Sequence, residues 1–310
     1  MKISVVILSW NRKADLEITL GNLLKQTINN FEIIVVDNDS HDGSQEMVET
    51  KFPKVILIKL PKNLGMGAWN IGAMNAKGDY LVFLDDDSFP ENNAFKKIIK
   101  KFDNDPSLGA ISGLIYNLNT GKIWDAFGWF GLDEKPKSKQ VISFIGCGVA
   151  FRKDLFLKVG GYDMDYFVYC IELPLSALIY NNGYHIYCFP EIVFYHRYSM
   201  TNRTSSRSYY YTTRNSLWTV WQFYPLIPSI LKTLELTFFS FARAMLNIKN
   251  MNPIRYFLEA NFSAFTKFHF YFIKSRVKLK KNTFRMVNQS LVFRPLAAYL
   301  REKQLKISDS

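Results

Sequence analysis

Three consecutive carboxylates, Asp85, Asp86 and Asp87, are the residues of this sequence best suited to chemistry. They follow the apolar run Tyr80–Leu84, which is typical of a buried strand. Adjacent carboxylates at a strand end suit Mg²⁺ or Mn²⁺, which prefer oxygen ligands and share them with phosphates. A cation would also relieve the repulsion among three like charges. Taken alone, the run is equally typical of a solvated acidic turn, but its place after a buried strand favours a metal site.

Two further polar clusters also follow apolar runs. The run 3–8 is followed by Ser9, Trp10 and Asn11. The run 31–36 is followed by a polar turn that begins with Asp37 and Asn38. Side-chain oxygens of this kind can accept hydrogen bonds from a base or a ribose, and a tryptophan can stack on the base. Taken alone, the second cluster is more typical of ordinary turn chemistry.

A glycine-rich segment, residues 63–72, leads into helical spacing and contains Asn63, Gly65 and Asn70. Such a segment can bring backbone N–H groups and the positive end of a helix close to a diphosphate. It matches neither the dinucleotide-binding glycine fingerprint nor the Walker lysine pattern. Taken alone, the segment is only weak evidence for a diphosphate-binding site.

Alternating strands and helices must position these clusters. Apolar runs predict strands at 3–8, 31–36, 55–60 and 80–84, and helical spacing predicts helices at 16–26, 44–51 and 68–76. This order predicts an α/β fold with a mostly parallel, doubly wound sheet. Ligands of such sheets bind beyond the carboxyl ends of the strands, where all three polar clusters would converge.

The middle of the chain is less regular. We expect a strand at 143–151, helices at 154–159 and 173–181, and short strands at 184–188 and 192–195, the last ending at His196. An isolated histidine is usually an ordinary buried or surface residue. The position of His196 at a strand end favours a functional role.

Composition excludes several classes of protein. The chain has 310 residues, 48% of them hydrophobic, and three cysteines without metal-ligand spacing. It is therefore not a disordered chain, a disulfide-stapled mini-protein or a zinc-finger protein. We predict no secretory signal, because the first apolar run is too short, and no transmembrane helix.

Charge divides the chain into two parts. Residues 197–310 contain 19 Lys and Arg against four Asp and Glu, whereas residues 1–196 contain 20 against 23. We therefore predict a catalytic domain at 1–200 and a helical, basic and aromatic region at 201–310. Pro225 and Pro228 interrupt the most apolar stretch of that region, so we expect it to lie on an anionic membrane surface rather than cross it. The expected anchors are Trp218, Trp221, Phe238, Phe239 and Phe241, and the expected headgroup contacts are Lys274, Arg276, Lys278, Lys280 and Lys281.

The segments 4–44, 63–72 and 80–87 together resemble family 2 glycosyltransferases with the GT-A fold. Within that family, Val-Asp-Asn-x-Ser-x-Asp-Gly-Ser at 36–44 and the two Asn-x-Gly units at 63–72 look most like bacterial rhamnosyl- and galactofuranosyltransferases. The likeness covers roughly residues 3–215. The order and spacing of the motifs are more specific than any motif alone.

The resemblance implies a role for each matching residue. It assigns Asp85 and Asp87 to a divalent cation, Mn²⁺ or Mg²⁺, and His196 completes that metal site in some members. It implies that Trp10 stacks on the base and that Asp37 and Asn38 contact base or ribose. The same nucleotide-sugar site would include Ser9, Asn11, Asn63, Gly65, Asn70 and Asp86. The segment Gly160-Gly161-Tyr162-Asp163 matches the family's Gly-Gly-Phe-Asp turn.

The candidate catalytic base departs from the family pattern. Members usually carry a Glu-Asp pair, followed two residues later by Asp, and the Asp of the pair is the base. Here Glu172 stands at the position of that Asp, Ile171 replaces the Glu and Pro174 replaces the later Asp. A glutamate can serve as the base, with one more methylene of reach. The other interpretation is that Glu172 only complements a helix dipole.

We therefore predict an inverting, metal-dependent glycosyltransferase that uses a UDP- or dTDP-linked sugar. The expected acceptor is a glycan or glycolipid, such as a lipid-linked intermediate of a surface polysaccharide. The alternative is a catalytically impaired nucleotide-sugar-binding or scaffold protein on the same fold. We expect no nucleic-acid partner, a cytoplasmic location at the inner face of the cell membrane, and homo-oligomers, if any, through the C-terminal helices.

Overall fold

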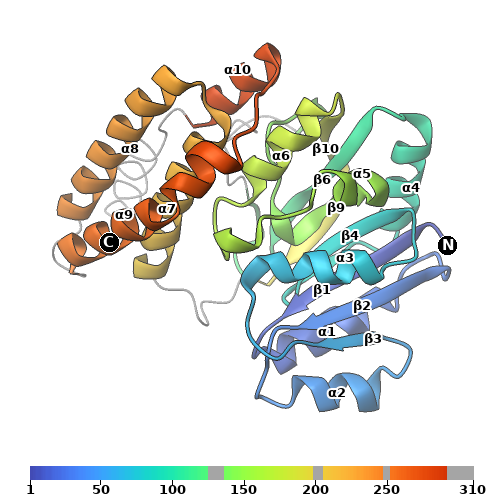
Figure 1. The fold of residues 1–310 in the computed structure, drawn as a ribbon. Coiled ribbons are helices and arrows are strands. Elements are labelled where there is room, and N and C mark those ends of the chain that lie inside the picture. Colours follow the sequence, from blue (N-terminus) through green and yellow to red (C-terminus); the bar gives the residue numbers. More distant parts are fainter. Residues whose placement is uncertain (125–135, 198–204, 247–251, 292–310) are drawn as a thin grey trace. The chain divides into compact units, whose positions relative to one another are not determined.

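The computed structural model of the protein describes residues 1–124, 136–197, 205–246 and 252–291. The chain divides into two compact units, Met1–Thr201 and Asn202–Ser310 (Figure 1). The first unit contains a ten-stranded sheet with helices on both faces, and the second unit is helical. The predicted α/β fold with a helical C-terminal region is confirmed.

Four parallel strands form the first half of the sheet, in the order β3-β2-β1-β4. They are β1 (Ile3–Ser9), β2 (Phe31–Asp37), β3 (Ile56–Lys59) and β4 (Tyr80–Asp85). Strands β1 and β4 are apolar on both faces, and their interior residues are buried. Parallel strands covered on both sides have this composition, which is why the predicted strands at these positions are confirmed.

Helices cover both faces of this half. Leu16 and Leu20 of α1 (Lys13–Leu23) belong to the same buried cluster as Val5 and Ile7 of β1. Helix α3 (Trp69–Asn75) packs on the opposite face of β1. A short 3₁₀ helix (Gly65–Ala68) comes directly before it. The remaining helix here is α2 (Ser44–Lys51). Alternate side chains of a strand point to opposite faces, so one strand supplies both cores.

The second half of the sheet is mixed. Strand β9 (Val149–Arg152) runs antiparallel to both β4 and β6 (Leu108–Asn117), and β10 (His185–His196) runs parallel to β6. Short strands complete the edges: β5 (Ser88–Pro90), β7 (Lys122–Ile123) and β8 (Lys139–Gln140). The helices are α4 (Ala94–Asn104), α5 (Lys153–Lys158) and α6 (Glu172–Asn181).

Three expectations for this half were wrong or incomplete. The strand predicted at 143–151 begins only at Val149, after a 3₁₀ turn at Gly146–Gly148. The two short strands predicted at 184–188 and 192–195 are one strand, β10, with an irregular register between Phe189 and Val193. The sequence analysis also missed α4 and β6, although β6 lies between β9 and β10 inside the sheet.

The second unit consists of α7 (Ser205–Phe223), α8 (Leu226–Leu246), α9 (Pro253–Thr266), a π-helical turn (Phe270–Lys274) and α10 (Lys281–Ser290). Helix α7 packs against both α8 and α9. Trp218 stacks on Tyr271 with ring centroids 4.7 Å apart, and Trp221 contacts Phe265. Both tryptophans are buried in this way, so their predicted role as exposed membrane anchors is wrong. No helix within the described ranges has the length and hydropathy that a membrane span requires.

Gly72 sets how closely α3 approaches the sheet. A Cβ atom at this position would lie 2.2 Å from Cγ1 of Val6 and 3.0 Å from Cγ2 of Val36. We predict that Gly72→Ala lowers the free energy of unfolding by about 1–3 kcal/mol, because the helix must move off the sheet. Urea unfolding measures the change. The matched control is Gly21→Ala in α1, where a Cβ has no neighbour within 4 Å. There the better helix propensity of alanine should stabilise by up to about 1 kcal/mol, and equal effects at both sites would contradict the packing argument.

Candidate active site

Strand register brings the three predicted clusters to one edge of the sheet. Ser9 of β1 pairs with Asp37 of β2, and Leu8 pairs with Asp85 of β4. The carboxyl ends of three adjacent parallel strands therefore carry the polar residues, as the sequence predicted. Figure 1 shows β1, β2 and β4 side by side in the first unit.

Asp37 keeps one carboxylate oxygen without a partner. Its Oδ1 accepts hydrogen bonds from the backbone N–H of Ser40 at 2.9 Å and from Nε2 of Gln45 at 2.7 Å. Its Oδ2 is buried and has no hydrogen-bond partner among the described residues, and the same is true of the Ser9 hydroxyl. A buried oxygen without a partner is costly unless a ligand satisfies it. These two groups are therefore suited to hydrogen-bond with a ligand at the sheet edge.

Asn38 and Asn63 instead build the loop before α3. Nδ2 of Asn38 donates to Oδ1 of Asn63 at 3.0 Å and to the carbonyl of Gly65 at 3.1 Å. Oδ1 of Asn38 accepts from the backbone N–H of Leu64 at 2.8 Å. Gly65 has a φ of +66°, and a Cβ there would lie 2.2 Å from the carbonyl oxygen of Phe167. The asparagine side chains therefore fix the shape of this loop.

Asn70 holds the turn that contains Tyr162. Its Nδ2 donates to the Tyr162 carbonyl at 2.7 Å, and its Oδ1 accepts from the Tyr162 N–H at 2.9 Å. The Tyr162 hydroxyl is buried and has no hydrogen-bond partner among the residues described here. Burial first, and then the charges of Glu172 and Asp85, raise the pKa of Tyr162 well above its usual value. Tyr162 therefore stays protonated and can donate a hydrogen bond near the carboxylates of Glu172 and Asp85.

Two tryptophans of the first unit have different surroundings. Trp69 is fully buried and stacks on Phe83 with ring centroids 5.6 Å apart, so it fills the core. Trp10 is only partly buried, and its backbone N–H donates to Oδ2 of Asp86 at 3.2 Å. Base stacking by Trp10 stays a prediction.

Arg12 neutralises the buried part of the acidic run. Its Nη1 lies 2.5 Å from Oδ2 of Asp87 and 3.4 Å from Oδ1 of Asp86. Burial raises the pKa of Asp86 well above its usual value, and the charge of Arg12 opposes that shift. Burial also lowers the pKa of Arg12, but the carboxylates outweigh this and the net shift is upward. The sequence analysis missed Arg12, because nothing local links it to acids more than 70 positions away.

His196 at the end of β10 joins the same cluster. Its Nε2 lies 3.0 Å from Oδ1 of Asp87, and both side chains are fully buried. The Trp124 ring stacks on the imidazole with centroids 5.1 Å apart. Asp87, predicted as a cation ligand, is therefore in contact with Arg12 and His196.

A group of three potential metal ligands consists of Asp85, Cys147 and His196. One donor atom from each lies within 4.8 Å of the others. Carboxylate, thiol and imidazole are all recognised metal donors, and their convergence fits a divalent cation. The sequence predicted Asp85 and His196 but not Cys147, because a lone cysteine between two glycines carries no metal-ligand spacing. Its contribution depends on the 3₁₀ turn that the sequence analysis took for a strand.

Glu172 begins α6 and has a strongly shifted acidity. Burial first, and the negative charge of Asp85 to a smaller extent, raise the pKa of Glu172 to about 7, although backbone N–H groups at the helix start oppose the shift. The chain just before it is strained, because Phe167, Tyr169 and Cys170 all have positive φ, between 54° and 63°. Such strain is costly and occurs mainly where a site fixes the backbone. The loop therefore holds a carboxylate whose pKa lies near neutrality.

The sheet and its flanking helices have the GT-A fold, and comparisons with known proteins agree. The profile of the family described as Glycosyl transferase family 2 matches residues 4–160. This match covers half of the chain, which therefore belongs to glycosyl transferase family 2.

Individual relatives are more distant. An uncharacterized glycosyltransferase of Haemophilus influenzae is 29% identical over 51% of this chain and 55% of its own length. The probable glycosyltransferase YdaM of Bacillus subtilis is 28% identical over 62% of this chain and 50% of its own length. A glucosyl-dolichyl phosphate glucuronosyltransferase of Haloferax volcanii is 26% identical over 58% of this chain and 64% of its own length. The chain thus spans about half to two thirds of these curated relatives.

Two solved structures share the fold. The mannosyltransferase PcManGT of Pyrobaculum calidifontis, in complex with GDP-Man and Mn²⁺, has a TM-score of 0.55 at 18% identity and covers 100% of this chain and 81% of its own. S. aureus TarS 1–349 in complex with UDP-GlcNAc has a TM-score of 0.59 at 17% identity and covers 94% of this chain and 91% of its own. At these identities the likeness shows the fold alone.

Removal of Arg12 tests its role in the acidic cluster. We predict that Arg12→Met lowers the free energy of unfolding by about 3–5 kcal/mol near pH 8, because it leaves buried carboxylates without a counter-charge. The loss should shrink towards pH 5. In the variant the native carboxyls bind protons more readily than the unfolded ones do, so stability rises as pH falls. Denaturant titrations at both pH values measure this.

The control for this prediction is Arg255→Met. Arg255 also pairs with a carboxylate, Oε1 of Glu259 at 2.7 Å, but its side chain is 69% exposed. An exposed pair contributes at most about 1 kcal/mol, so this variant should change little at either pH. Equal losses in the two variants, or a loss at Arg12 that does not depend on pH, would contradict the assignment.

Proposed function

We propose that the protein is an inverting glycosyltransferase that moves a sugar from a nucleoside diphosphate to an acceptor hydroxyl, with Glu172 as the general base. The observation that carries the proposal is the Glu172 carboxylate, whose pKa is raised to about 7 mainly by burial and to a smaller extent by the charge of Asp85. A base is most effective when its pKa lies near the working pH. Family membership supports sugar transfer as the reaction.

The donor would bind at the carboxyl ends of β1 and β2. Oδ2 of Asp37 and the Ser9 hydroxyl offer partners for the N–H and hydroxyl groups of a nucleoside. Trp10, next to Ser9, is partly exposed and would stack on the base. We propose a UDP- or dTDP-linked sugar as the donor. TarS in complex with UDP-GlcNAc supports a uridine donor, whereas PcManGT holds GDP-Man.

In the transfer step Glu172 accepts the proton of the acceptor hydroxyl as its oxygen bonds to the anomeric carbon. The bond from that carbon to the diphosphate oxygen breaks on the opposite face of the sugar, so the configuration inverts. Asp85, Cys147 and His196 would hold a divalent cation, with Asp87 as a further predicted ligand. A bound cation would offset the charge that grows on the departing diphosphate.

The two departures from the family pattern are compatible with this role. Ile171 is buried, so it contributes an apolar contact where the family has a carboxylate. Pro174 is the third residue of α6, where a backbone N–H has no intrahelical acceptor and a proline costs little. Neither change removes the carboxylate at 172. The alternative of a catalytically impaired binding protein predicts donor binding without transfer.

The imidazole of His196 supports Mn²⁺ over Mg²⁺. Mg²⁺ demands a near-ideal octahedron of oxygen ligands, which an imidazole does not supply. Mn²⁺ is also the cation named with the PcManGT structure. We therefore propose Mn²⁺ as the cofactor.

The proposed acceptor is a lipid-linked glycan, and the proposed location is the inner face of the cell membrane. The name of the Haloferax relative, a glucosyl-dolichyl phosphate glucuronosyltransferase, supports a lipid-linked acceptor. The excess of Lys and Arg in residues 197–310 supports a negatively charged surface as partner.

Cation binding can be measured without any sugar substrate. We predict that Asp85→Asn weakens Mn²⁺ binding by roughly tenfold or more, because the group of Asp85, Cys147 and His196 loses its carboxylate. Electron paramagnetic resonance of free Mn²⁺ gives the affinity. The control is Asp79→Asn, a carboxylate whose side chain is 63% exposed beside Lys2. Unchanged binding in the Asp85 variant would place the cation elsewhere.

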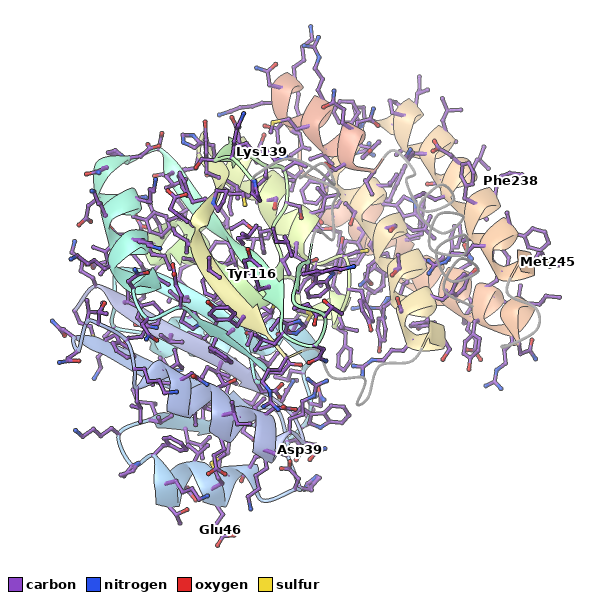
Figure 2. The ribbon with its side chains drawn as sticks, turned by 180° about the vertical axis from the view of Figure 1, so that it is seen from behind. Asp39, Glu46, Tyr116, Lys139, Phe238 and Met245 are labelled. Atoms are coloured by element: carbon purple, nitrogen blue, oxygen red, sulfur yellow. The ribbon has the colours of Figure 1, made fainter. Side chains whose placement is uncertain are left out.

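The base is tested by rate and by pH. We predict that Glu172→Gln lowers the transfer rate by about 10²–10⁴ while donor binding survives. In the wild type the rate should rise with pH up to about 7 and then level off, because only deprotonated Glu172 accepts the proton. Glu46→Gln, an exposed helical glutamate visible in Figure 2, should leave the rate unchanged. Normal transfer by Glu172→Gln would remove Glu172 as the base and leave Asp163 or Asp165 as candidates.

The titration of Glu172 should also change the free energy of unfolding with pH. The native pKa of Glu172, about 7, lies above the usual value of 4.5 for a glutamate, so between these pH values the native state holds a proton that the unfolded state has released. The free energy of unfolding therefore falls as pH rises through this window. The Glu172→Gln variant should lack this contribution. Thermal melts of both proteins at pH 4.5 to 8 measure it, and parallel curves would contradict the raised pKa.

A further inference from the structure

Helix α8 exposes apolar side chains to solvent and buries several polar ones. Across 226–245 every exposed side chain is apolar. These exposed residues are Leu226, Ile227, Pro228, Ile230, Leu231, Leu234, Phe238, Phe241 and Met245. Ile227 is 70% exposed and Phe238 is 68% exposed. Figure 2 shows Phe238 and Met245 projecting outward from the helical unit.

The polar side of α8 faces inward. Ser229, Lys232 and Ser240 are buried, and Nζ of Lys232 lies 2.7 Å from Oε1 of Glu235. Oγ1 of Thr233 accepts a hydrogen bond from Nε1 of Trp221 at 2.9 Å. These contacts fix the rotation of the helix, because turning its apolar side inward would break them. Contacts within the unit therefore keep the apolar side of α8 exposed.

Helix α9 extends the same surface. Ile254, Leu258, Phe262 and Phe265 recur at helical spacing and are all exposed, Phe262 at 76%. The rings of Phe241 in α8 and Phe257 in α9 join the two helices with centroids 5.5 Å apart. We call the exposed apolar residues of α8 and α9 the apolar face. Soluble monomers seldom leave a contiguous surface of this kind uncovered.

The charge of the unit indicates what covers the apolar face. Residues 205–291 contain two acidic side chains, Glu235 and Glu259, and both are paired with basic ones. The π-helical turn exposes two apolar side chains, Phe270 and Ile273, followed by Lys274. Further exposed basic side chains follow at Lys278, Lys280, Lys281 and Arg285. A second copy of this chain would bring like charge against like charge, whereas an anionic lipid surface is complementary to both features.

We propose that the apolar face of α8 and α9 inserts into one leaflet of an anionic membrane, with the basic residues of 274–285 against the lipid headgroups. The 21 residues of α8 span about 31 Å, and they would lie in the plane of the interface, not across the bilayer. The anchors are therefore aliphatic and phenylalanine side chains of α8 and α9. This inference deepens the proposed function by naming the membrane-binding surface, and it does not depend on the identity of the donor.

Vesicle flotation with the full chain tests the inference. The probes are vesicles of phosphatidylcholine alone and of phosphatidylcholine with 30% phosphatidylglycerol. The face variant replaces Ile230, Leu234 and Phe238 with Gln. The charge variant replaces Lys274, Lys278 and Lys280 with Gln. The control replaces Leu24 and Met74 with Gln, two apolar residues of the first unit that are 67% and 62% exposed.

We expect the wild type and the control to float preferentially with anionic vesicles, and less so at high salt. The face variant should lose binding to both vesicles, by roughly tenfold for each large side chain removed. The charge variant should lose only the anionic preference. Failure of the wild type to float, or equal flotation of the face variant, would overturn the inference. So would a dimer in light scattering that the face variant dissociates, because the apolar face would then join two copies.

Donor binding tests the proposed function independently of membrane binding. Thermal shifts with UDP-, dTDP- and GDP-sugars report donor binding in the first unit, because a ligand that binds only the native state raises its melting temperature. We expect the face variant to keep the donor response of the wild type. A face variant that has lost the donor response as well as flotation would show that the substitutions disrupt the protein rather than one surface.

Discussion

The burial of two adjacent carboxylates at the end of β4 is the constraint on which the candidate site depends. Asp86 and Asp87 are almost fully shielded from water, and such charges persist only when they are paired. Arg12 supplies the pairing from the segment after β1, and His196 supplies a second contact from the end of β10. Three distant segments of the chain are therefore tied to one point of the sheet.

Because of this pairing, the three adjacent aspartates have different roles. Asp86 and Asp87 are occupied by contacts within the protein, so Asp85 is the member of the run that joins Cys147 in the metal-ligand group. Burial raises the pKa of Glu172, and the negative charge of Asp85 adds to that shift. Asp85 therefore belongs to the metal-ligand group and also contributes to the acidity of the candidate base.

Three residues predicted as ligand contacts also hold the backbone around the site. Asn38 and Asn63 use their amides on the loop around Gly65, and Asn70 uses both of its side-chain polar atoms on the backbone of Tyr162. Asp37, by contrast, retains a buried oxygen without a partner among the described residues. The hydrogen bonds thus distinguish asparagines that hold the backbone from a carboxylate that still has an oxygen available to a ligand, a difference that the sequence does not show.

The sequence by itself determined the fold class, the four parallel strands and the place of the acidic run, because buried strands and the turns that follow them leave a local pattern. It also predicted Glu172 through resemblance. The tertiary structure alone decided the pairing of Arg12, the approach of Cys147 to His196 and the inward polar side of α8. These depend on contacts between segments far apart in the chain. The anchor prediction erred for the same reason: Trp218 and Trp221 are apolar at helical spacing, but which side of a helix faces inward is set by what packs against it.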